Sequence, residues 1–303
     1  MNNTPLVSIS CLTYNHGQFI RKCLDGFLMQ KTNFQFEVLI HDDASTDNTR
    51  AIIEEYAHKY PDVIFPLIQS ENQYQQGVRG MMAKFNFPRA RGKYIALCEG
   101  DDYWTDPLKL QKQVDFLETH SDYALCFHKS MVLQDDELLP DPLEERYNRI
   151  EKYPVTKIDL LEQSNFMHTN SVVFRNGWKV NPIELNYSPA GDYLMHILVA
   201  EYGKIHRIDE VMGIYRMGSG IYSTLDSFNL RKQKLKLEIC IVSMLQDSAE
   251  KEVVLKKIMQ SLDHMKNPLA EVNRFDSLKD IVSIKLMARI IVYKLKRIFQ
   301  KKP

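Results

Sequence analysis

Three carboxylates follow one apolar segment within four residues. Residues 94–98 are apolar and predict a buried strand; Glu99, Asp101 and Asp102 come next, with Gly100 between them. So much negative charge at the end of a buried strand is costly unless a positive charge shares the site. Hard divalent cations such as Mg²⁺ or Mn²⁺ take oxygen ligands and can hold phosphates at the same time. The cluster predicts a metal site, with a solvated acidic turn as the alternative.

A second acidic cluster follows the apolar run at residues 36–40. A carboxylate there can accept the imide N–H of uracil or thymine, so Asp42 or Asp43 is a candidate for reading a nucleobase. The alternative is a helix N-cap, which the stretch at residues 45–47 already provides. Arg79 and Lys84 could neutralise phosphate, although the pattern favours a solvated helix face for either residue taken singly.

Single polar residues elsewhere are open to two interpretations. Asp192 begins a predicted helix, where the helix dipole favours an acid in any case. His41 and His168 lie beside polar strand ends. No histidines have the spacing of a zinc site.

The elements that must position these residues alternate regularly. Predicted strands cover residues 6–13, 36–40, 63–68 and 94–98, with helices at 19–28 and 48–60 and an irregular helix at 77–91. This alternation predicts a mostly parallel sheet with helices on both faces. Ligands of such sheets bind beyond the carboxyl ends of the strands, where both acidic clusters should meet.

The rest of the chain predicts more strands and then helices alone. Strands are expected at residues 123–133, 171–174, 205–208 and 211–215, and helices at 106–120 and 191–203. Residues 134–154 are acidic and proline-containing, which favours a loop or short helix. Helices are predicted at 228–247, 249–264 and 268–300. We place a soft boundary near residue 225, between an α/β domain at 1–225 and a helical region at 226–303.

Composition limits the class of protein. The chain has 303 residues, 44% of them apolar, and 39 basic side chains balance 39 acidic ones, which gives no indication of nucleic-acid binding. The five cysteines have no CxxC spacing, and those in strand-like runs are expected to be small buried hydrophobes. We find no signal peptide and no apolar run of the roughly 20 residues that span a bilayer, so a cytoplasmic protein is expected.

The C-terminal end is basic and amphipathic. Residues 281–302 alternate apolar side chains with Lys and Arg and contain no acid. This pattern is typical of a helix that lies on an anionic membrane surface, at the inner face of the cell membrane for a cytoplasmic protein. Packing against the α/β domain or a second subunit would explain it equally well, so an oligomer stays open.

Six segments together resemble the family 2 glycosyltransferases of GT-A fold, especially bacterial enzymes of surface-polysaccharide synthesis. The specific matches are residues 7–20 (VSISCLTYNHGQFI), 38–49 (VLIHDDASTDNT) and 92–113 (GKYIALCEGDDYWTDPLKLQKQ). Weaker matches are residues 168–175, 190–205 and 211–223. Order and spacing make the resemblance specific, and it covers most of residues 5–225.

The resemblance implies a role for each matching position. Glu99 and Asp101 would hold Mg²⁺ or Mn²⁺ against the donor diphosphate, followed by Asp102, and Asp192 would be the general base. Glu99 stands at a position where the family has aspartate, so its contact with the metal could be direct or through water. The implied nucleotide pocket comprises Thr13, Tyr14, Asn15, Asp42 or Asp43, Arg79, Lys84 and Asp101. Trp104, His168 and Arg216 are candidates for acceptor contacts or for the closing loop.

The implied activity is inverting transfer of a sugar from a nucleotide-sugar donor, with UDP favoured and dTDP second, to a glycan or lipid-linked acceptor. Two other functions are considered as alternatives. A nucleotide-sugar-binding module without catalysis is one, since the histidine that often follows Tyr215-Arg216 in the family is absent. A nucleotidyltransferase is the other, although the stretch at residues 14–17 lacks the glycine-rich basic loop of that class.

Overall fold

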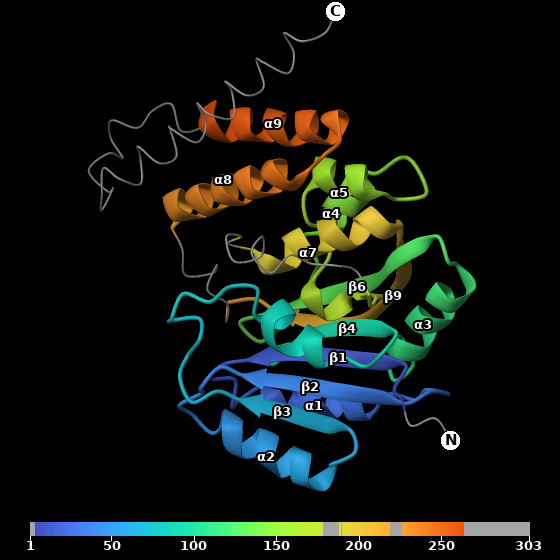
Figure 1. The fold of residues 1–303 in the computed structure, drawn as a ribbon, viewed down its shortest axis with the longest axis vertical. Helices are drawn as coiled ribbons and strands as arrows, with labels where there is room; N and C mark the ends of the chain where they lie inside the picture. The colour runs from blue at the N-terminus through green and yellow to red at the C-terminus, as the bar shows by residue number, and fades with distance from the viewer. Residues whose placement is uncertain (1–3, 178–187, 189, 219–225, 264–303) are drawn as a thin grey trace, which may run out of the picture. The chain divides into compact units, whose positions relative to one another are not determined.

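A nine-stranded mixed sheet forms the centre of the fold in the computed structural model, which describes residues 4–177, 188, 190–218 and 226–263 (Figure 1). The strands are β1 (Val7–Thr13), β2 (Phe36–Asp42), β3 (Ile64–Ile68), β4 (Tyr94–Glu99), β5 (Tyr103–Trp104), β6 (Tyr123–Gln134), β7 (Glu137–Pro140), β8 (Val173–Arg175) and β9 (Lys204–Arg216). Their order is β3-β2-β1-β4-β8-β6-β9-β5, and β7 pairs with β6.

The helices follow the strands along the chain. They are α1 (Ile20–Leu28), α2 (Thr49–Lys59), α3 (Lys109–Thr119), α4 (Glu144–Asn148), α5 (Lys157–Gln163), α7 (Gly191–Val199), α8 (Ser227–Met244) and α9 (Ser248–Asp263). Short 3₁₀ or π turns are η1 (Met82–Asn86), η2 (Phe87–Arg89), η3 (Thr169–Ser171) and η4 (Ala200–Tyr202).

The first four strands of the chain form the parallel half of the sheet. β1 lies between β2 and β4, with Thr13 opposite Asp42 and Leu12 opposite Glu99. Both acidic clusters therefore leave the sheet at the same edge, as the sequence predicts.

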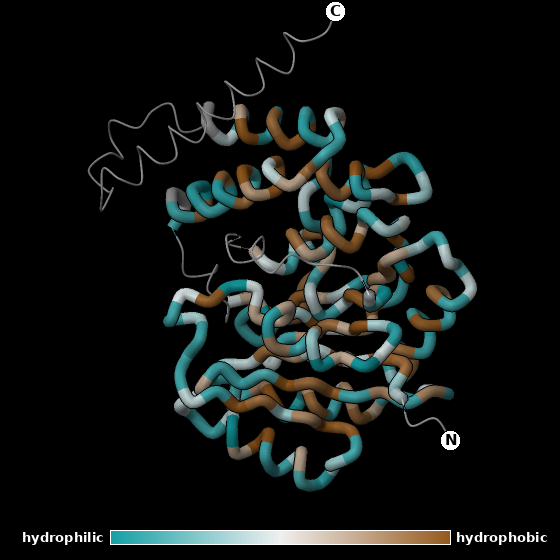
Figure 2. Tube along the Cα trace, in the orientation of Figure 1, coloured by the Kyte–Doolittle hydropathy of each residue, from teal (hydrophilic) through white to brown (hydrophobic). Residues whose placement is uncertain are grey.

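Both faces of the parallel half are covered. Along β1, Val7, Ile9 and Cys11 join one apolar core with side chains of α1, α2 and α3. The side chains between them point to the other face, where Asn86 of η1 donates to Ser10 Oγ at 3.0 Å. Strands buried on both faces are expected to be mainly apolar, and the trace of the central strands is mostly brown (Figure 2), although Ser8 and Ser10 are buried polar residues of β1.

The second half of the sheet joins the acidic turn to distant parts of the chain. β6 and β9 run parallel over most of their lengths, with register shifts near Lys129. β5 pairs antiparallel with β9, so Tyr103 lies opposite Ile214. Because β5 directly follows the acidic turn, β9 ends beside that turn.

Most predicted elements are confirmed with small changes at their ends. Two differ in kind. Residues 205–208 and 211–215 form one strand, β9, because pairing with β6 resumes at Val211 after skipping the exposed Asp209 and Glu210, which form a bulge. Residues 134–154 contain a strand, β7, and the short helix α4.

The chain divides into two compact units after Lys257, and the functional boundary near residue 225 stays a prediction. The first unit contains the sheet. The described part of the second unit is the end of α9, from Ile258 to Asp263. The predicted helix at 268–300, its amphipathic segment 281–302 and residues 219–225 lie outside the described residues. Within the described part of the chain, no helix combines the length and apolar character of a membrane crossing.

All five cysteines lie in the described residues and none forms a disulfide. Four are buried, namely Cys11, Cys98 and Cys126 on strands of the sheet and Cys23 on α1, while Cys240 of α8 is partly exposed. Burial raises the pKa of the Cys98 and Cys126 thiols to about 12. The interpretation of the strand cysteines as buried hydrophobes is confirmed.

Candidate active site

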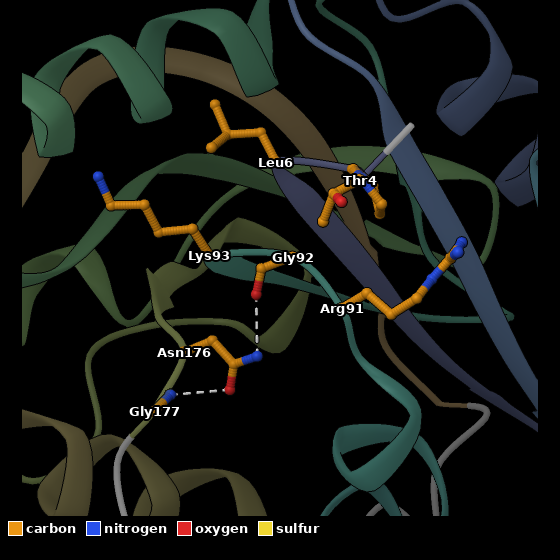
Figure 3. Close-up of a pocket in the computed structure, with 8 residues that line it drawn as sticks. Thr4, Leu6, Arg91, Gly92, Lys93, Asn176 and Gly177 are labelled. Carbon is orange, nitrogen blue, oxygen red and sulfur yellow. Dashed lines mark hydrogen bonds between the residues drawn. The ribbon is translucent and has the colours of Figure 1, made fainter. Parts of the chain in front are cut away.

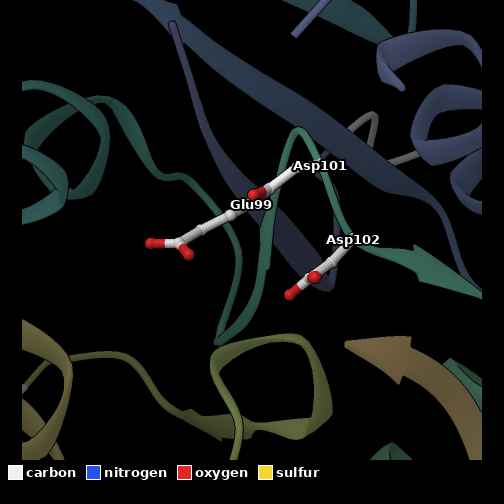
Figure 4. A group of neighbouring side chains, drawn as sticks. All are labelled: Glu99, Asp101 and Asp102. Carbon is white, nitrogen blue, oxygen red and sulfur yellow. The ribbon is translucent and has the colours of Figure 1, made fainter. Parts of the chain in front are cut away.

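The acidic turn connects β4 to β5. Oxygen atoms of Glu99, Asp101 and Asp102 lie within 4.8 Å of one another, and the three side chains leave the turn on the same side (Figure 4). Gly100 permits this geometry, because a Cβ atom at that position would lie 2.7 Å from Thr13 Oγ1. The turn thus packs directly against the end of β1.

The electrostatics of the turn favour a bound cation. Burial, followed by the charges of Asp101 and Asp192, raises the pKa of Glu99 to about 8. Burial and then Asp101 raise the pKa of Asp102 well above its ordinary value. Asp102 Oδ2 is buried and has no hydrogen-bond partner among the described residues. Hard oxygen ligands, crowded charge and an unsatisfied oxygen fit a divalent ion such as Mg²⁺ or Mn²⁺.

Two loops beside the turn bring together the predicted nucleotide-binding residues. Asn15, at φ 54°, accepts at its Oδ1 from the Thr46 backbone N–H at 2.8 Å. Gly17 N–H donates to Asp47 Oδ2 at 2.9 Å, which ties the loop after β1 to the loop after β2. Tyr14 is 37% exposed, whereas Thr13 is buried.

Asp42 and Asp43 have different surroundings. Asp42 is fully buried, and its carboxylate accepts from the Ser45 hydroxyl and backbone N–H. Asp43 accepts from the backbone N–H groups of Gln73 at 2.7 Å and Tyr74 at 3.0 Å. Asp43 therefore fixes the loop that follows β3 and is the aspartate of the two that keeps some exposure.

Arg79 and Lys84 have different surroundings. The Arg79 guanidinium stacks on Tyr74 at 3.9 Å from the ring centroid and donates to the Tyr74 carbonyl at 2.9 Å. It therefore stabilises the loop from Asn72 to Arg79. Lys84 is exposed on η1.

Asp192 lies in the first turn of α7. Its carboxylate accepts a hydrogen bond from Asn165 Nδ2 at 3.2 Å. Its charge is one of those that raise the pKa of Glu99, which places it in the electrostatic neighbourhood of the acidic turn. The structure therefore brings Asp192 toward the turn from a separate part of the chain.

The three acceptor or loop candidates have different environments. Trp104 is 2% exposed, donates from Nε1 to the Asn170 carbonyl at 2.8 Å and packs edge-on against Phe27. Burial leaves almost no indole surface of Trp104 open to a substrate, and the acceptor contact of this residue stays a prediction.

His168 and Arg216 lie near the predicted site. His168 Nε2 is 2.9 Å from Asp141 Oδ1, and its ring stacks on Tyr215 at 4.1 Å between centroids. Arg216 donates its backbone N–H to Asp102 Oδ1 at 2.7 Å and its Nε–H to the Asp101 carbonyl at 3.1 Å. Arg216 thereby fastens the end of β9 to the acidic turn.

Four residues of this region were missed as site residues. His16 Nε2 lies 3.9 Å from Asp101 Oδ2, and burial lowers the pKa of this histidine. Burial and then the acids of the turn raise the pKa of Tyr215. Asn165 donates a hydrogen bond to Asp192, and His196 is hydrogen-bonded to Asn165. Position after β1 could have indicated His16, but no local pattern indicates Asn165.

A hollow of about 460 Å³ lies elsewhere, at the amino ends of β1 and β4 (Figure 3). Its lining includes Arg91, Lys93 and Asn176, and the two cations are paired with Glu37 and Glu118. Asn176 Nδ2 donates to the Gly92 carbonyl at 2.9 Å. The acidic clusters are at the opposite ends of these strands, so this hollow is separate from the candidate site.

Comparison with known sequences gives a consistent result. Residues 8–177 match the sequence model of "Glycosyl transferase family 2". The protein Rv1520 of Mycobacterium tuberculosis is 41% identical over 215 residues, 69% of this chain and 58% of the relative. Bacillus subtilis TuaG, named for teichuronic acid biosynthesis, is 33% identical over 134 residues, 44% of this chain and 50% of the relative. The chain thus spans little more than half the length of these relatives.

Solved structures share the fold. Staphylococcus aureus TarS, residues 1–349 in complex with UDP-GlcNAc, superposes with a TM-score of 0.65 at 16% identity, covering 93% of this chain and 79% of TarS. The mannosyltransferase PcManGT of Pyrobaculum calidifontis, in complex with GDP-Man and Mn²⁺, superposes with a TM-score of 0.62 at 16% identity. The match covers 98% of this chain and 83% of PcManGT. The predicted GT-A fold is confirmed. Because the family match covers more than half of its residues, the chain belongs to glycosyl transferase family 2.

Proposed function

We propose that the chain is an inverting, metal-dependent glycosyltransferase that moves a sugar from a nucleotide-sugar donor to a hydroxyl of a glycan or lipid-linked acceptor in cell-surface polysaccharide synthesis. One observation carries this proposal. The three carboxylates of the acidic turn meet at the carboxyl edge of the parallel strands, and a fourth acid, Asp192, reaches their neighbourhood from α7. A metal site and a separate base are the two parts that such a displacement needs.

In the proposed reaction, Asp192 takes the proton of the acceptor hydroxyl while that oxygen bonds to the anomeric carbon. The bond from this carbon to the diphosphate oxygen breaks, and the nucleoside diphosphate leaves with the electron pair. A positioned base typically contributes 10²–10⁴-fold to such a step. Glu99, Asp101 and Asp102 would hold a divalent ion, which supplies Lewis-acid stabilisation of the departing diphosphate.

Other residues would bind and orient the donor. Tyr14 and Asn15 stand exposed at the loop after β1, and Asp43 is the candidate that reads the base. Its carboxylate oxygens can accept from the imide of uracil or thymine beside the two backbone N–H groups, which fits UDP, the favoured nucleotide, and dTDP. The solved neighbours bind UDP-GlcNAc and GDP-Man, which supports a nucleotide-sugar donor, and the Mn²⁺ of the second supports a metal. The name of TuaG supports a polysaccharide product.

A donor screen tests the activity. Purified protein is incubated with UDP-, dTDP- and GDP-sugars, with Mn²⁺ or with EDTA, and release of nucleoside diphosphate is measured. We expect release from one donor class, strictly dependent on the metal. Binding without release from any donor would favour the non-catalytic binding module. Release of pyrophosphate from sugar phosphate and nucleoside triphosphate would favour the nucleotidyltransferase.

Replacing the proposed base is the sharpest single test. Asp192→Asn should lower turnover by 10²-fold or more because the amide cannot accept the proton, while the affinity for UDP and Mn²⁺ stays unchanged. Turnover is measured by nucleoside diphosphate release and affinity by calorimetry. Asp122→Asn, at an exposed acid paired with Lys204, is the control. Near-wild-type turnover of Asp192→Asn would remove it from the role of base.

A further inference from the structure

The candidate base is held by a chain of hydrogen bonds that no part of the proposed mechanism requires. Asn165 Nδ2 donates to Asp192 Oδ2 at 3.2 Å, and Asn165 Oδ1 lies 3.2 Å from His196 Nδ1. Within the described part of the chain, Asn165 is the residue that donates a hydrogen bond to Asp192. Asn165 belongs to the segment between α5 and η3, whereas Asp192 and His196 belong to α7.

The orientation of the Asn165 amide is fixed by the backbone. Met167 N–H donates to Asn165 Oδ1 at 3.3 Å, and a backbone N–H can only donate. The amide oxygen must therefore face Met167, which directs the NH₂ group to Asp192. His196 must then donate from Nδ1 to the same amide oxygen.

His196 is suited to this role. It is fully buried one helical turn after Asp192, so both side chains lie on the same face of α7. Burial lowers the pKa of His196 to about 4, which keeps the ring neutral near pH 7. When the proton of His196 is on Nδ1, the ring nitrogen Nε2 is unprotonated. This buried Nε2 has no hydrogen-bond partner among the described residues.

Further contacts hold the segment of Asn165 against its surroundings. Arg146 Nη1 donates to the Asn165 carbonyl at 2.7 Å. The preceding residue, Ser164, has φ 65°, a left-handed conformation that is uncommon for serine and ends α5 abruptly. Tyr193 donates its hydroxyl to the Leu160 carbonyl at 3.0 Å, which joins α7 to α5. The Asn165 amide is therefore held rigidly relative to the start of α7.

We propose that Asn165 is a positioning residue, which orients the Asp192 carboxylate toward the acceptor hydroxyl and stabilises its ionised form, with His196 and the Met167 N–H locking the amide. The assignment of Asp192 as the base rests on the proposed function, but the hydrogen-bonded chain does not. Asn165 itself touches no reacting atom and acts through Asp192.

The surroundings of Asp192 offer its carboxylate no opposite charge from the groups whose pKa values it influences, which are Glu99 of β4, Tyr215 of β9 and His196 of its own helix. Glu99 and Tyr215 are acids, and His196 is neutral near pH 7. An N–H donor favours the charged form of a carboxylate, whereas nearby negative charge favours the protonated form.

A direct test measures the protonation of Asp192 without any substrate. The protein is labelled with ¹³C at aspartate carboxyl carbons, and the Asp192 signal is identified by its loss in Asp192→Asn. Asn165→Ala should move the titration midpoint of that signal upward by about 0.5–1 pH unit. Asn176→Ala is the matched control, because that amide also bonds through both ends but lies at the other end of the sheet. An unmoved midpoint in a folded Asn165→Ala protein would overturn the proposal.

A double-mutant cycle tests the consequence for turnover, using the donor found in the screen. Asn165→Ala should lower kcat about 10-fold or more, with the KM for donor unchanged and the acid limb of the pH profile moved upward. His196→Asn should have a smaller effect, because the Met167 N–H still holds the amide. The double variant Asn165→Ala with Asp192→Asn should be no slower than Asp192→Asn alone.

The outcomes separate the two proposals. Full additivity in the cycle, or a loss in the Asn165 variant with an unchanged pH profile, would overturn the positioning role and leave the base assignment intact. Near-wild-type turnover of Asp192→Asn would overturn the base assignment, whatever the ¹³C titration shows. Thermal melting of each variant checks that it is folded.

Discussion

The three carboxylates of the acidic turn differ in their exposure and in the hydrogen bonds that they accept from the protein. Asp102 is 1% exposed, and one of its oxygens accepts the Arg216 backbone N–H. Asp101 retains 8% exposure, and Glu99 is partly exposed. Asp102 therefore fastens β9 to the turn through one oxygen and leaves the other for the proposed cation, whereas Asp101 and Glu99 are the proposed ligands that keep some exposure.

This difference predicts unequal effects on metal binding. Asp101→Asn should raise the Mn²⁺ concentration needed for half-maximal UDP binding by roughly 10-fold or more, since a charged hard ligand is lost. Asp102→Asn should lower thermal stability more than it changes the Mn²⁺ requirement. Calorimetric titrations of UDP at several Mn²⁺ concentrations measure the first, and melting curves the second. An unchanged Mn²⁺ requirement in Asp101→Asn would exclude it as a ligand.

At the scale of elements, the close approach of β4 to β1 depends on one glycine. A Cβ atom on Gly92 would lie 2.5 Å from the Ser8 backbone N and 2.7 Å from the Val7 carbonyl carbon. Gly92 N–H also donates to Ser8 Oγ at 2.9 Å. Because β4 carries Glu99 at its far end, the entry of this strand sets where the acidic turn lies.

Gly92→Ala should therefore destabilise the protein by about 1–3 kcal/mol, since backbone atoms cannot move aside as a flexible side chain would. Gly191→Ala is the matched control, because no atom lies within 4 Å of a Cβ there and alanine favours the first turn of a helix. The free energy of unfolding in urea measures both. Equal stability of the two variants would contradict the packing argument.

Features that depend on residues close together in the sequence could be predicted, whereas features that depend on distant contacts could not. The parallel strands and the acidic turn are predicted, because apolar runs and the residues that end them are neighbours in the chain. β9 is predicted as two strands, since Asp209 and Glu210 look like a turn until the pairing with β6 is known. Asn165 carries no signal, because its contacts with Asp192 and His196 lie 27 and 31 residues away.

At the scale of the whole molecule, buried histidines in three separate elements are kept neutral. Burial lowers the pKa of His41, at the end of β2, to about 4, and lowers that of His196 in α7 to about 4. The pKa of His128 in β6 is also lowered well below its ordinary value by burial. Gln69 Nε2 lies 3.0 Å from His41 Nε2, a contact that suits an unprotonated acceptor.

The stability of the whole protein should consequently depend on pH. Between pH 6.5 and 4 the unfolded chain binds more protons at these histidines than the folded chain, so the free energy of unfolding falls as the pH falls through this window. His41→Gln, which keeps an acceptor for Gln69, should reduce that loss by about 1–3 kcal/mol. Urea unfolding at pH 7 and pH 4.5 measures it. Parallel losses in wild type and variant would contradict the prediction.

The distribution of the cysteines should make thiol labelling of the native protein proceed in a fast and a slow phase. Four thiols lie in the apolar core, three on strands and Cys23 on α1, and the fifth, Cys240, is partly exposed on α8. A thiol reagent added to the native protein reaches Cys240 first, and it reaches the other four only when the core between α1 and the sheet opens. The rate of the slow labelling thus reports how often the central sheet opens, in the absence of denaturant and without an engineered probe.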